Sequence, residues 1–295
     1  MDLVTITNFL NWFLMIALPI LLGIFLTIKF HLGWRIWLIG ASTFILSQVF
    51  HLPFNKYILN PILENIQKTL PEVSSTLLIA ISLGLSAGIF EEISRFGMYN
   101  WWLKNDRTWK KGILAGAGHG GIEAIILGIL VMLTYINLMA YRNVDLSYLN
   151  LAPEQLSIAR QQIEMYWSLS WYDSLLGALE RMLTIPFHIA ASVLVLQVFT
   201  RNPKRLMYIW LVIAVLYHTI LDASVVLIAG QWGVYAAEAF LAITVVLDII
   251  IIFTLRQPDP EPTSPLPPQN AGEPLVFTPT PVEETSDNLE KTRYQ

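Results

Sequence analysis

Ionisable side chains interrupt four of the long apolar stretches of this sequence. One stretch carries two adjacent glutamates and an arginine, and the other three combine histidine or arginine with a carboxylate. The residues concerned are Glu91, Glu92, Arg95, His119, Glu123, Glu180, Arg181, His188, His218 and Asp222. A charged side chain in a bilayer interior costs about 2.5–3.5 kcal/mol or more, so such a set needs partners and is typical of a functional site.

The first stretch places its three charges within one helical turn. Arg95 follows Glu91 by four residues and Glu92 by three, so the guanidinium can reach either carboxylate. The two glutamates, being adjacent, point about 100° apart on a helix. One glutamate can therefore be held by Arg95 while the other faces a cavity, and the spacing alone does not decide which.

Two histidines each precede a carboxylate by one helical turn. His119 lies four residues before Glu123, and His218 lies four before Asp222. Glycines strip side chains from the helix face around residues 116–121, which lets a backbone or a substrate come close. His51 stands alone near the end of another apolar stretch, and we expect it to pack between helices.

This set of residues could carry out hydrolysis. A glutamate in a pocket of low dielectric suits a general base that activates water. Neutral imidazoles nearby could hold that water, donate to an oxyanion or bind a metal. Hydrolysis of a peptide bond in a membrane-embedded substrate uses the set best. The same groups could pass protons in an antiporter, and an Arg–Glu pair such as Glu180–Arg181 often serves as a packing clamp.

The elements that must position these residues are membrane-spanning helices. Of the 295 residues, 55% are apolar and 14% charged, and the apolar residues form blocks of the length that crosses a bilayer. The predicted fold is an all-α, polytopic transmembrane helix bundle with about seven spans. The spans are expected at residues 9–30, 34–51, 76–101, 112–140, 175–200, 206–229 and 234–255.

The sequence predicts one membrane domain and a tail. Residues 1–256 form the transmembrane domain, and the proline-rich residues 257–295 are expected to be a disordered cytoplasmic tail. Residues 53–75, with three prolines, are expected to form a connection. Within the loop 141–173, apolar residues recur at helical spacing after Pro153, which predicts an amphipathic helix at the membrane interface.

Basic residues at the ends of the spans predict the orientation. With the N-terminus outside, ten Lys and Arg face the cytoplasm and four face outward, which favours N-out/C-in. The ten are Lys29, Arg35, Lys104, Arg107, Lys110, Lys111, Arg201, Lys204, Arg205 and Arg256, and the four are Lys56, Lys68, Arg142 and Arg160.

Depth within the spans indicates that the ionisable residues meet. At about 1.5 Å per residue, Glu91 lies about 14 Å and His119 about 10 Å from the basic ends of their spans. His188 and His218 lie about 18 Å from theirs by the same rise. All four therefore fall in one layer between the bilayer centre and its cytoplasmic side.

Composition excludes several classes of function. There are no cysteines, so disulfides, thiolate zinc sites and a cysteine nucleophile are excluded. The net charge of −4 is small, and nothing suggests nucleic acid as a partner. No internal repeat is evident, which speaks against the inverted-repeat transporters.

The motifs, taken in order, resemble those of the YhfC family of intramembrane proteases. The likeness covers about residues 5–255, and the family is related to the PrsW proteases and to the CAAX-protease and bacteriocin-processing group. The motifs are Glu91-Glu92-x-x-Arg95, His119-x-x-x-Glu123, Glu180-Arg181 followed by His188, and His218-x-x-x-Asp222. The second and fourth motifs depart from the CAAX branch towards the PrsW pattern, so a prenylated substrate is not implied.

The resemblance implies roles for these residues. Glu91 would be the base, Glu92 with Arg95 its support, His119 a water-holding or metal-binding group, and His188 and His218 oxyanion stabilisers, with Asp222 orienting His218. Glu123 would join the catalytic set, and Glu180 and Arg181 would support it. The cofactor would be none or a divalent metal such as zinc, held if present by His119, His188 and His218.

The resemblance also implies a setting. The protein would be a multi-pass integral protein of a prokaryotic-type plasma membrane, with a membrane-embedded protein or peptide as substrate and the lipid bilayer as its surroundings. Two alternatives stay open: a proton-coupled membrane transporter, and a non-catalytic membrane scaffold of the same fold.

Overall fold

The computed structural model describes residues 2–203 and 207–258. These described residues belong to one structural unit, which holds all the helices named below. The predicted tail, residues 257–295, lies outside the described residues except for its first two positions.

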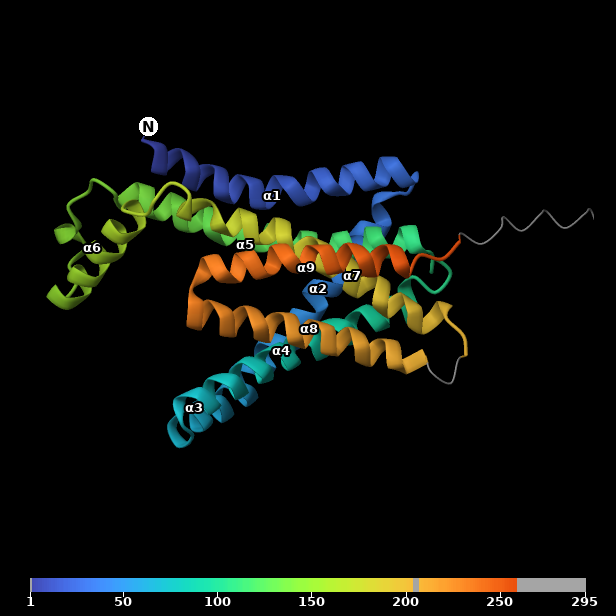
Figure 1. The fold of residues 1–295 in the computed structure, drawn as a ribbon. Coiled ribbons are helices and arrows are strands. Elements are labelled where there is room, and N and C mark those ends of the chain that lie inside the picture. Colours follow the sequence, from blue (N-terminus) through green and yellow to red (C-terminus); the bar gives the residue numbers. More distant parts are fainter. Residues whose placement is uncertain (1, 204–206, 259–295) are drawn as a thin grey trace, which may run out of the picture. The chain divides into compact units, whose positions relative to one another are not determined.

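The described residues form helices joined by short loops (Figure 1). The α-helices are α1 (Leu3–Phe30), α2 (Trp34–Phe54), α3 (Asn60–Thr69), α4 (Glu72–Gly97), α5 (Trp109–Tyr141), α6 (Pro153–Trp167), α7 (Leu176–Thr200), α8 (Met207–Trp232) and α9 (Val234–Thr254). Two π-turns, η1 (Asn55–Leu59) and η2 (Met98–Trp102), and two 3₁₀ turns, η3 (Leu146–Leu149) and η4 (Asp173–Leu175), complete the order.

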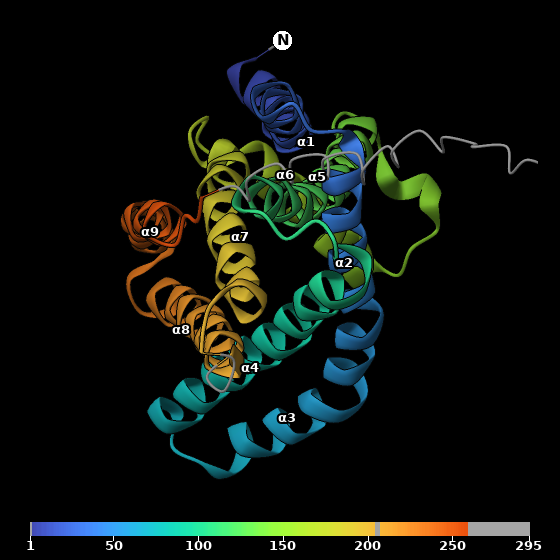
Figure 2. The same cartoon turned by 90° about the vertical axis from the view of Figure 1, so that its right-hand side faces the viewer.

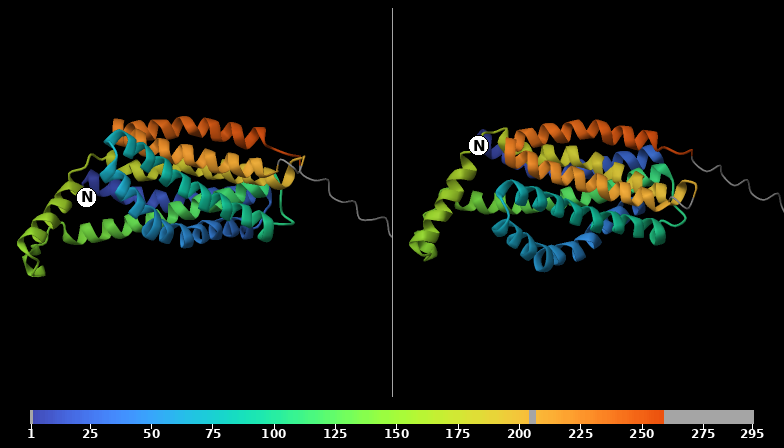
Figure 3. Two further views of the ribbon diagram at one scale, coloured as in Figure 1. Left: turned by 90° about the horizontal axis from the view of Figure 1, so that it is seen from below. Right: turned by 60° about the horizontal axis from the view of Figure 1, so that its bottom comes forward.

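Seven helical segments in this part of the chain are long and apolar enough to span a membrane. The predicted all-α fold with seven spans is thus confirmed, and the protein is a multi-pass integral membrane protein. Its long helices lie side by side (Figure 3). The N-out/C-in orientation stays a prediction.

The expected connection at residues 53–75 is wrong for most of its length. The chain stays helical through η1 and α3, and the second span runs from Trp34 to Thr69. Pro61 directly follows the π-helical segment η1, and such a local departure from regular α-helical hydrogen bonding accommodates a residue without an N–H. The π-turn η1 precedes it, and the helix axis turns there so that α3 leads away from α5 (Figure 2). Only Pro71, the N-cap of α4, marks a real break.

Five helices surround the buried polar residues. α2 packs on α5, α5 on α7, α7 on α8, α8 on α4 and α4 on α2, while α1 lies against α5 and α9 against α7 and α8 (Figure 2). Glycines set the closest approach. A Cβ added at Gly40 would lie 1.9 Å from the Ala115 carbonyl oxygen, and one at Gly118 would lie 2.0 Å from that of Trp37. The backbones of α2 and α5 are therefore in direct contact.

The helix predicted after Pro153 is present as α6, and its interfacial location stays a prediction. Figure 1 shows α6 beyond the end of α5, apart from the other long helices. Arg142, just after α5, stacks on Trp167 of α6 at 4.1 Å and donates to Asp2 at 2.6 Å. Hydrogen bonds from Thr5, together with Arg142, lower the pKa of Asp2 to about 2.

Candidate active site

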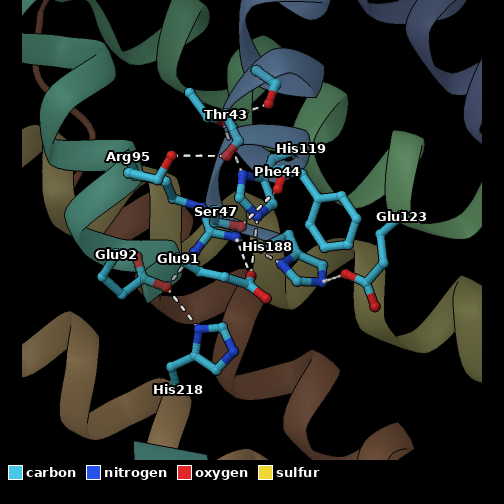
Figure 4. Close-up of polar contacts among 12 residues, drawn as sticks. Thr43, Phe44, Ser47, Glu91, Glu92, Arg95, His119, Glu123, His188 and His218 are labelled. Atoms are coloured by element: carbon cyan, nitrogen blue, oxygen red, sulfur yellow. Dashed lines mark hydrogen bonds and ion pairs between the residues drawn. The ribbon is translucent and has the colours of Figure 1, made fainter. Parts of the chain in front are cut away.

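Helices α4, α5, α7 and α8 bring their ionisable side chains to one buried point (Figure 4). Glu91, Glu92 and Arg95 come from α4, His119 from α5, and His188 and His218 from α7 and α8. All six are buried. Each of the residues that the sequence placed at one depth lies within hydrogen-bond distance of another member of the group.

Glu92 and Arg95 form the innermost pair. Both side chains have no exposed surface. Arg95 Nη1 donates to Glu92 Oε1, and the same carboxylate oxygen lies 2.8 Å from His218 Nδ1. Glu92 is therefore held between α4 and α8, and it does not line the cavity beside this group.

Glu91 faces the other way. Its Oε2 lies 3.0 Å from His119 Nε2 and 3.5 Å from Arg95 Nη2, and its Oε1 accepts from Gln48 Nε2 at 3.3 Å. Glu91 also lines the cavity. The spacing left the two glutamates equivalent, and the structure separates them: Glu92 is the one held closest by Arg95, and Glu91 is the one at the cavity.

The hydrogen bonds around His119 fix its tautomer. The Thr43 hydroxyl donates its single hydrogen to the Gly40 carbonyl at 2.5 Å, so it accepts from His119 Nδ1–H at 3.0 Å. A neutral His119 then points a bare Nε2 at Glu91 Oε2, 3.0 Å away. His119 Nε2 and Glu91 Oε2 are then both acceptors, and they attract each other only if a proton or a cation lies between them.

Glu123 pairs between helices rather than with His119, its neighbour along α5. Its carboxylate lies 2.8 Å from His188 Nε2 and accepts from Arg181 Nη1 at 2.6 Å. Arg181 also bonds Glu180. Gly120 makes the approach of α7 possible, since a Cβ there would lie 2.7 Å from the His188 ring.

His218 lies between two carboxylates. Its Nδ1 faces Glu92, and its Nε2 lies 3.4 Å from Asp222 Oδ2, so both nitrogens act as donors. Phe187 packs edge-on against the ring at 4.9 Å between centroids. His218 and Asp222, four residues apart on α8, therefore contact each other as their spacing predicted.

A cavity of about 300 Å³ adjoins these side chains. Its polar walls come from α2, α4, α5, α7 and α8, and apolar side chains of α8 and α9 close part of it. The polar lining residues are His51, Asn55, Glu91, Glu123, Glu180, Arg181, Thr184, His188, His218 and Asp222. A cavity that gathers titratable groups beside apolar walls has the character of a substrate site.

Three buried side chains, two of which line the cavity, could hold a divalent metal ion. Donor atoms of Glu91, His119 and His188 lie within 4.8 Å of one another. The second nitrogen of each histidine faces an outer partner, Thr43 or Glu123, as in metal sites whose ligands are held by neighbouring groups. Two histidines and a glutamate with an open fourth position are typical of catalytic zinc.

This group differs from the three-histidine set expected from the sequence. His218 bonds Glu92 and Asp222, so Glu91 takes its place among the candidate ligands. Arg95 Nη2 lies 2.8 Å from His188 Nδ1. An ion bound through that nitrogen would require the guanidinium to withdraw from it.

Side chains of α2 and of η1 contribute to the site in a way that the sequence did not predict. Thr43, Gln48 and Asn55 were not singled out, and His51 was expected only to pack. In the structure His51 and Asn55 line the cavity, and Thr43 and Gln48 contact the site histidine and glutamate. Polar residues recurring every four or so positions along an otherwise apolar span were the available signal.

Comparison with known proteins supports one family. The family model described as "YhfC intramembrane metalloprotease" matches residues 14–247. The "Uncharacterized membrane protein YhfC" of Bacillus subtilis (strain 168) is 30% identical over 238 residues, which cover 78% of this chain and 86% of that protein. No solved structure matches the chain.

Proposed function

Because this chain belongs to the YhfC intramembrane metalloprotease family, we propose that it hydrolyses peptide bonds in membrane-embedded proteins or peptides. One observation supports the proposal most strongly. Glu91, itself buried, lies at the wall of the cavity, and its donor atom lies within 4.8 Å of those of two histidines, which is a set suited to activating water. The relation to the PrsW and CAAX-processing groups stays a prediction.

Glu91 holds the attacking water. Glu91 lines the cavity, so a water bound there would meet its carboxylate, whose Oε2 lies 3.0 Å from His119 Nε2. The water oxygen attacks the scissile carbonyl carbon while Glu91 takes its proton. The same proton then passes to the amide nitrogen as the carbon–nitrogen bond breaks, which leaves a new carboxyl and a new amine.

His218 stabilises the oxyanion. His218 lines the cavity, and its Nε2 has only the long 3.4 Å contact with Asp222, so this nitrogen is the donor free to turn to a substrate oxygen. Its Nδ1 is held by Glu92, which fixes the ring. Both nitrogens of His188 face other side chains, which favours a positioning role over the oxyanion role first expected, and a ligand role only once Arg95 withdraws from Nδ1.

The remaining charged residues orient this set. Arg95 holds Glu92 and reaches Glu91, and Arg181 joins Glu180 of its own helix to Glu123 of α5. Glu123 in turn holds His188. Glu91, His119 and His188 would hold a divalent ion, which when bound supplies Lewis-acid activation of water and of the carbonyl.

Cleavage in proteoliposomes tests the proposal. The purified chain should cut a membrane-anchored reporter, and Glu91→Gln should abolish the cut while the variant elutes as the same monodisperse species. Metal analysis of the same preparation should find about one divalent ion per chain in the unaltered protein and much less in Glu91→Gln. Cleavage retained by Glu91→Gln would contradict the proposal, as would flux of a solute coupled to the pH gradient without any cleavage.

A further inference from the structure

A chain of hydrogen bonds runs along α2 and ends on the Glu91 carboxylate. Gln48 Nε2 donates to Glu91 Oε1 at 3.3 Å, and His51 Nδ1 lies 3.3 Å from Gln48 Oε1. Asn55 Nδ2 lies 2.9 Å from His51 Nε2, and Ser86 Oγ donates to Asn55 Oδ1 at 2.7 Å. This series of hydrogen bonds therefore starts at Ser86 of α4, passes through side chains of α2 and η1, and returns to α4 at Glu91.

Only one assignment of donors and acceptors satisfies every side chain in this series of hydrogen bonds. An ionised Glu91 only accepts, so Gln48 must present its NH₂ to it and its carbonyl oxygen to His51. His51 then carries its hydrogen on Nδ1 and accepts at Nε2 from the Asn55 amide. The Asn55 oxygen is left to accept from Ser86. In this arrangement Gln48, His51, Asn55 and Ser86 all have hydrogen-bond partners. The same arrangement makes Oε1 the oxygen of Glu91 that accepts from Gln48.

Packing holds His51 and Asn55, the middle of this hydrogen-bond series, in place. The His51 ring stacks on Phe90, the residue next to Glu91, with 5.4 Å between centroids and 25° between planes. Asn55 begins the π-turn η1, and irregular turns of this kind are frequent at functional sites. Amide side chains do not relay protons as water does, so a chain with Gln48 and Asn55 in it serves to orient.

We propose that Gln48, supported by His51 and Asn55, is a positioning residue that fixes the rotation of the Glu91 carboxylate. This role rests on the proposed function of Glu91 at the reacting water. Gln48 does not line the cavity, so it acts through Glu91 rather than on substrate. With Oε1 held by Gln48, Oε2 stays directed at His119.

Gln48→Met tests this role, because methionine keeps the length of the side chain and removes its hydrogen bonds to Glu91, His51 and the adjacent Ser47. On a membrane-anchored reporter cleaved by the unaltered protein, kcat should fall about 10- to 100-fold with KM nearly unchanged, the range of losses seen when outer-shell partners are removed. Gln197→Met is the matched control. Gln197 is a buried glutamine of α7 that bonds Val193, Arg201 and Gln257 and lies outside the cavity, so this substitution should leave kcat unchanged. His51→Gln, which keeps an N–H donor, should retain more kcat than His51→Leu.

Infrared spectroscopy gives a readout that does not need activity. The difference spectrum between the unaltered protein and Glu91→Gln identifies the Glu91 carboxyl stretch, and Gln48→Met should shift that band while Gln197→Met does not. An unshifted band, an unchanged kcat, or a rise in KM alone for Gln48→Met would overturn the positioning role. Cleavage that survives Glu91→Gln would instead overturn the proposed function, so the two failures are distinct.

Discussion

At the scale of single residues, the two adjacent glutamates differ only in what surrounds them. Glu92 meets Arg95 and His218 and has no exposed surface, whereas Glu91 meets His119 and Gln48 and borders the cavity. The sequence could predict that one glutamate would pair with Arg95 and the other would face a cavity. It could not choose between them, because the choice depends on which neighbouring helix each carboxylate meets.

These different surroundings predict that Glu→Gln mainly lowers stability at Glu92 and mainly abolishes cleavage at Glu91. Glu92→Gln leaves Arg95 buried without its closest carboxylate, so the free energy of unfolding should fall by about 3 kcal/mol. Glu91→Gln keeps the Arg95–Glu92 pair and should lower stability much less while abolishing cleavage. Thermal unfolding in detergent compares the two. Equal unfolding midpoints for the two variants would show that the glutamates are structurally equivalent.

Thr43 is predicted to act through His119. Thr43→Val keeps the shape of the side chain but removes the acceptor of His119 Nδ1–H, which frees the ring to turn. Removal of an outer partner of this kind lowers metal affinity or activity about 10- to 100-fold. Thr134→Val, at an exposed α5 threonine that bonds only its own helix, is the control. The prediction is checked by titrating Zn²⁺ into each variant, and equal affinities would contradict it.

At the scale of elements, helix packing decides which residues can meet. The sequence predicted the seven spans and the approximate depth of each ionisable group, because apolar length and distance from basic loops are local properties. The pairings between helices were not predictable. Glu123, one turn from His119, instead bonds His188 and Arg181 of α7, and the α2 residues Thr43 and Gln48 joined the site without a sequence motif to mark them. Pro53 and Pro61 also misled, since the helix continues through both of them into α3.

Close contact between α2 and α5 makes Gly118 sensitive to any added atom. Its Cβ would lie 2.0 Å from the Trp37 carbonyl, so Gly118→Ala must push α2 away from α5. Such overpacking lowers stability by about 1–3 kcal/mol or more. At Gly230 of α8 nothing lies within 4 Å, and Gly230→Ala should instead stabilise the helix by about 0.5–1 kcal/mol. Unfolding midpoints that shift the same way in both variants would rule out this packing account.

At the scale of the whole molecule, the ring of α2, α4, α5, α7 and α8 encloses polar groups that an apolar bilayer would not tolerate singly. Each buried charge of the site has a partner on another helix or one turn away, so the charges that support the proposed chemistry also tie the helices together. The distribution of Lys and Arg at the helix ends predicts how this ring is oriented in the membrane.

The absence of cysteine makes the orientation simple to measure. A single cysteine can be placed at the exposed Lys104 between η2 and α5, or at the exposed Glu154 of α6, without altering any native thiol. For N-out/C-in, a membrane-impermeant maleimide added to intact cells should label Glu154→Cys, and Lys104→Cys only after permeabilisation. The reverse pattern would invert the predicted topology.

The central claim is that Glu91 directs water onto a peptide bond inside the membrane. Mass spectrometry of cleavage carried out in H₂¹⁸O tests it most directly, with the unaltered protein and Glu91→Gln reconstituted side by side with a membrane-anchored reporter. The account predicts one ¹⁸O in the new C-terminal carboxyl of the product from the unaltered protein, and no product from Glu91→Gln. Product from Glu91→Gln at the unaltered rate, or product without ¹⁸O, would contradict it.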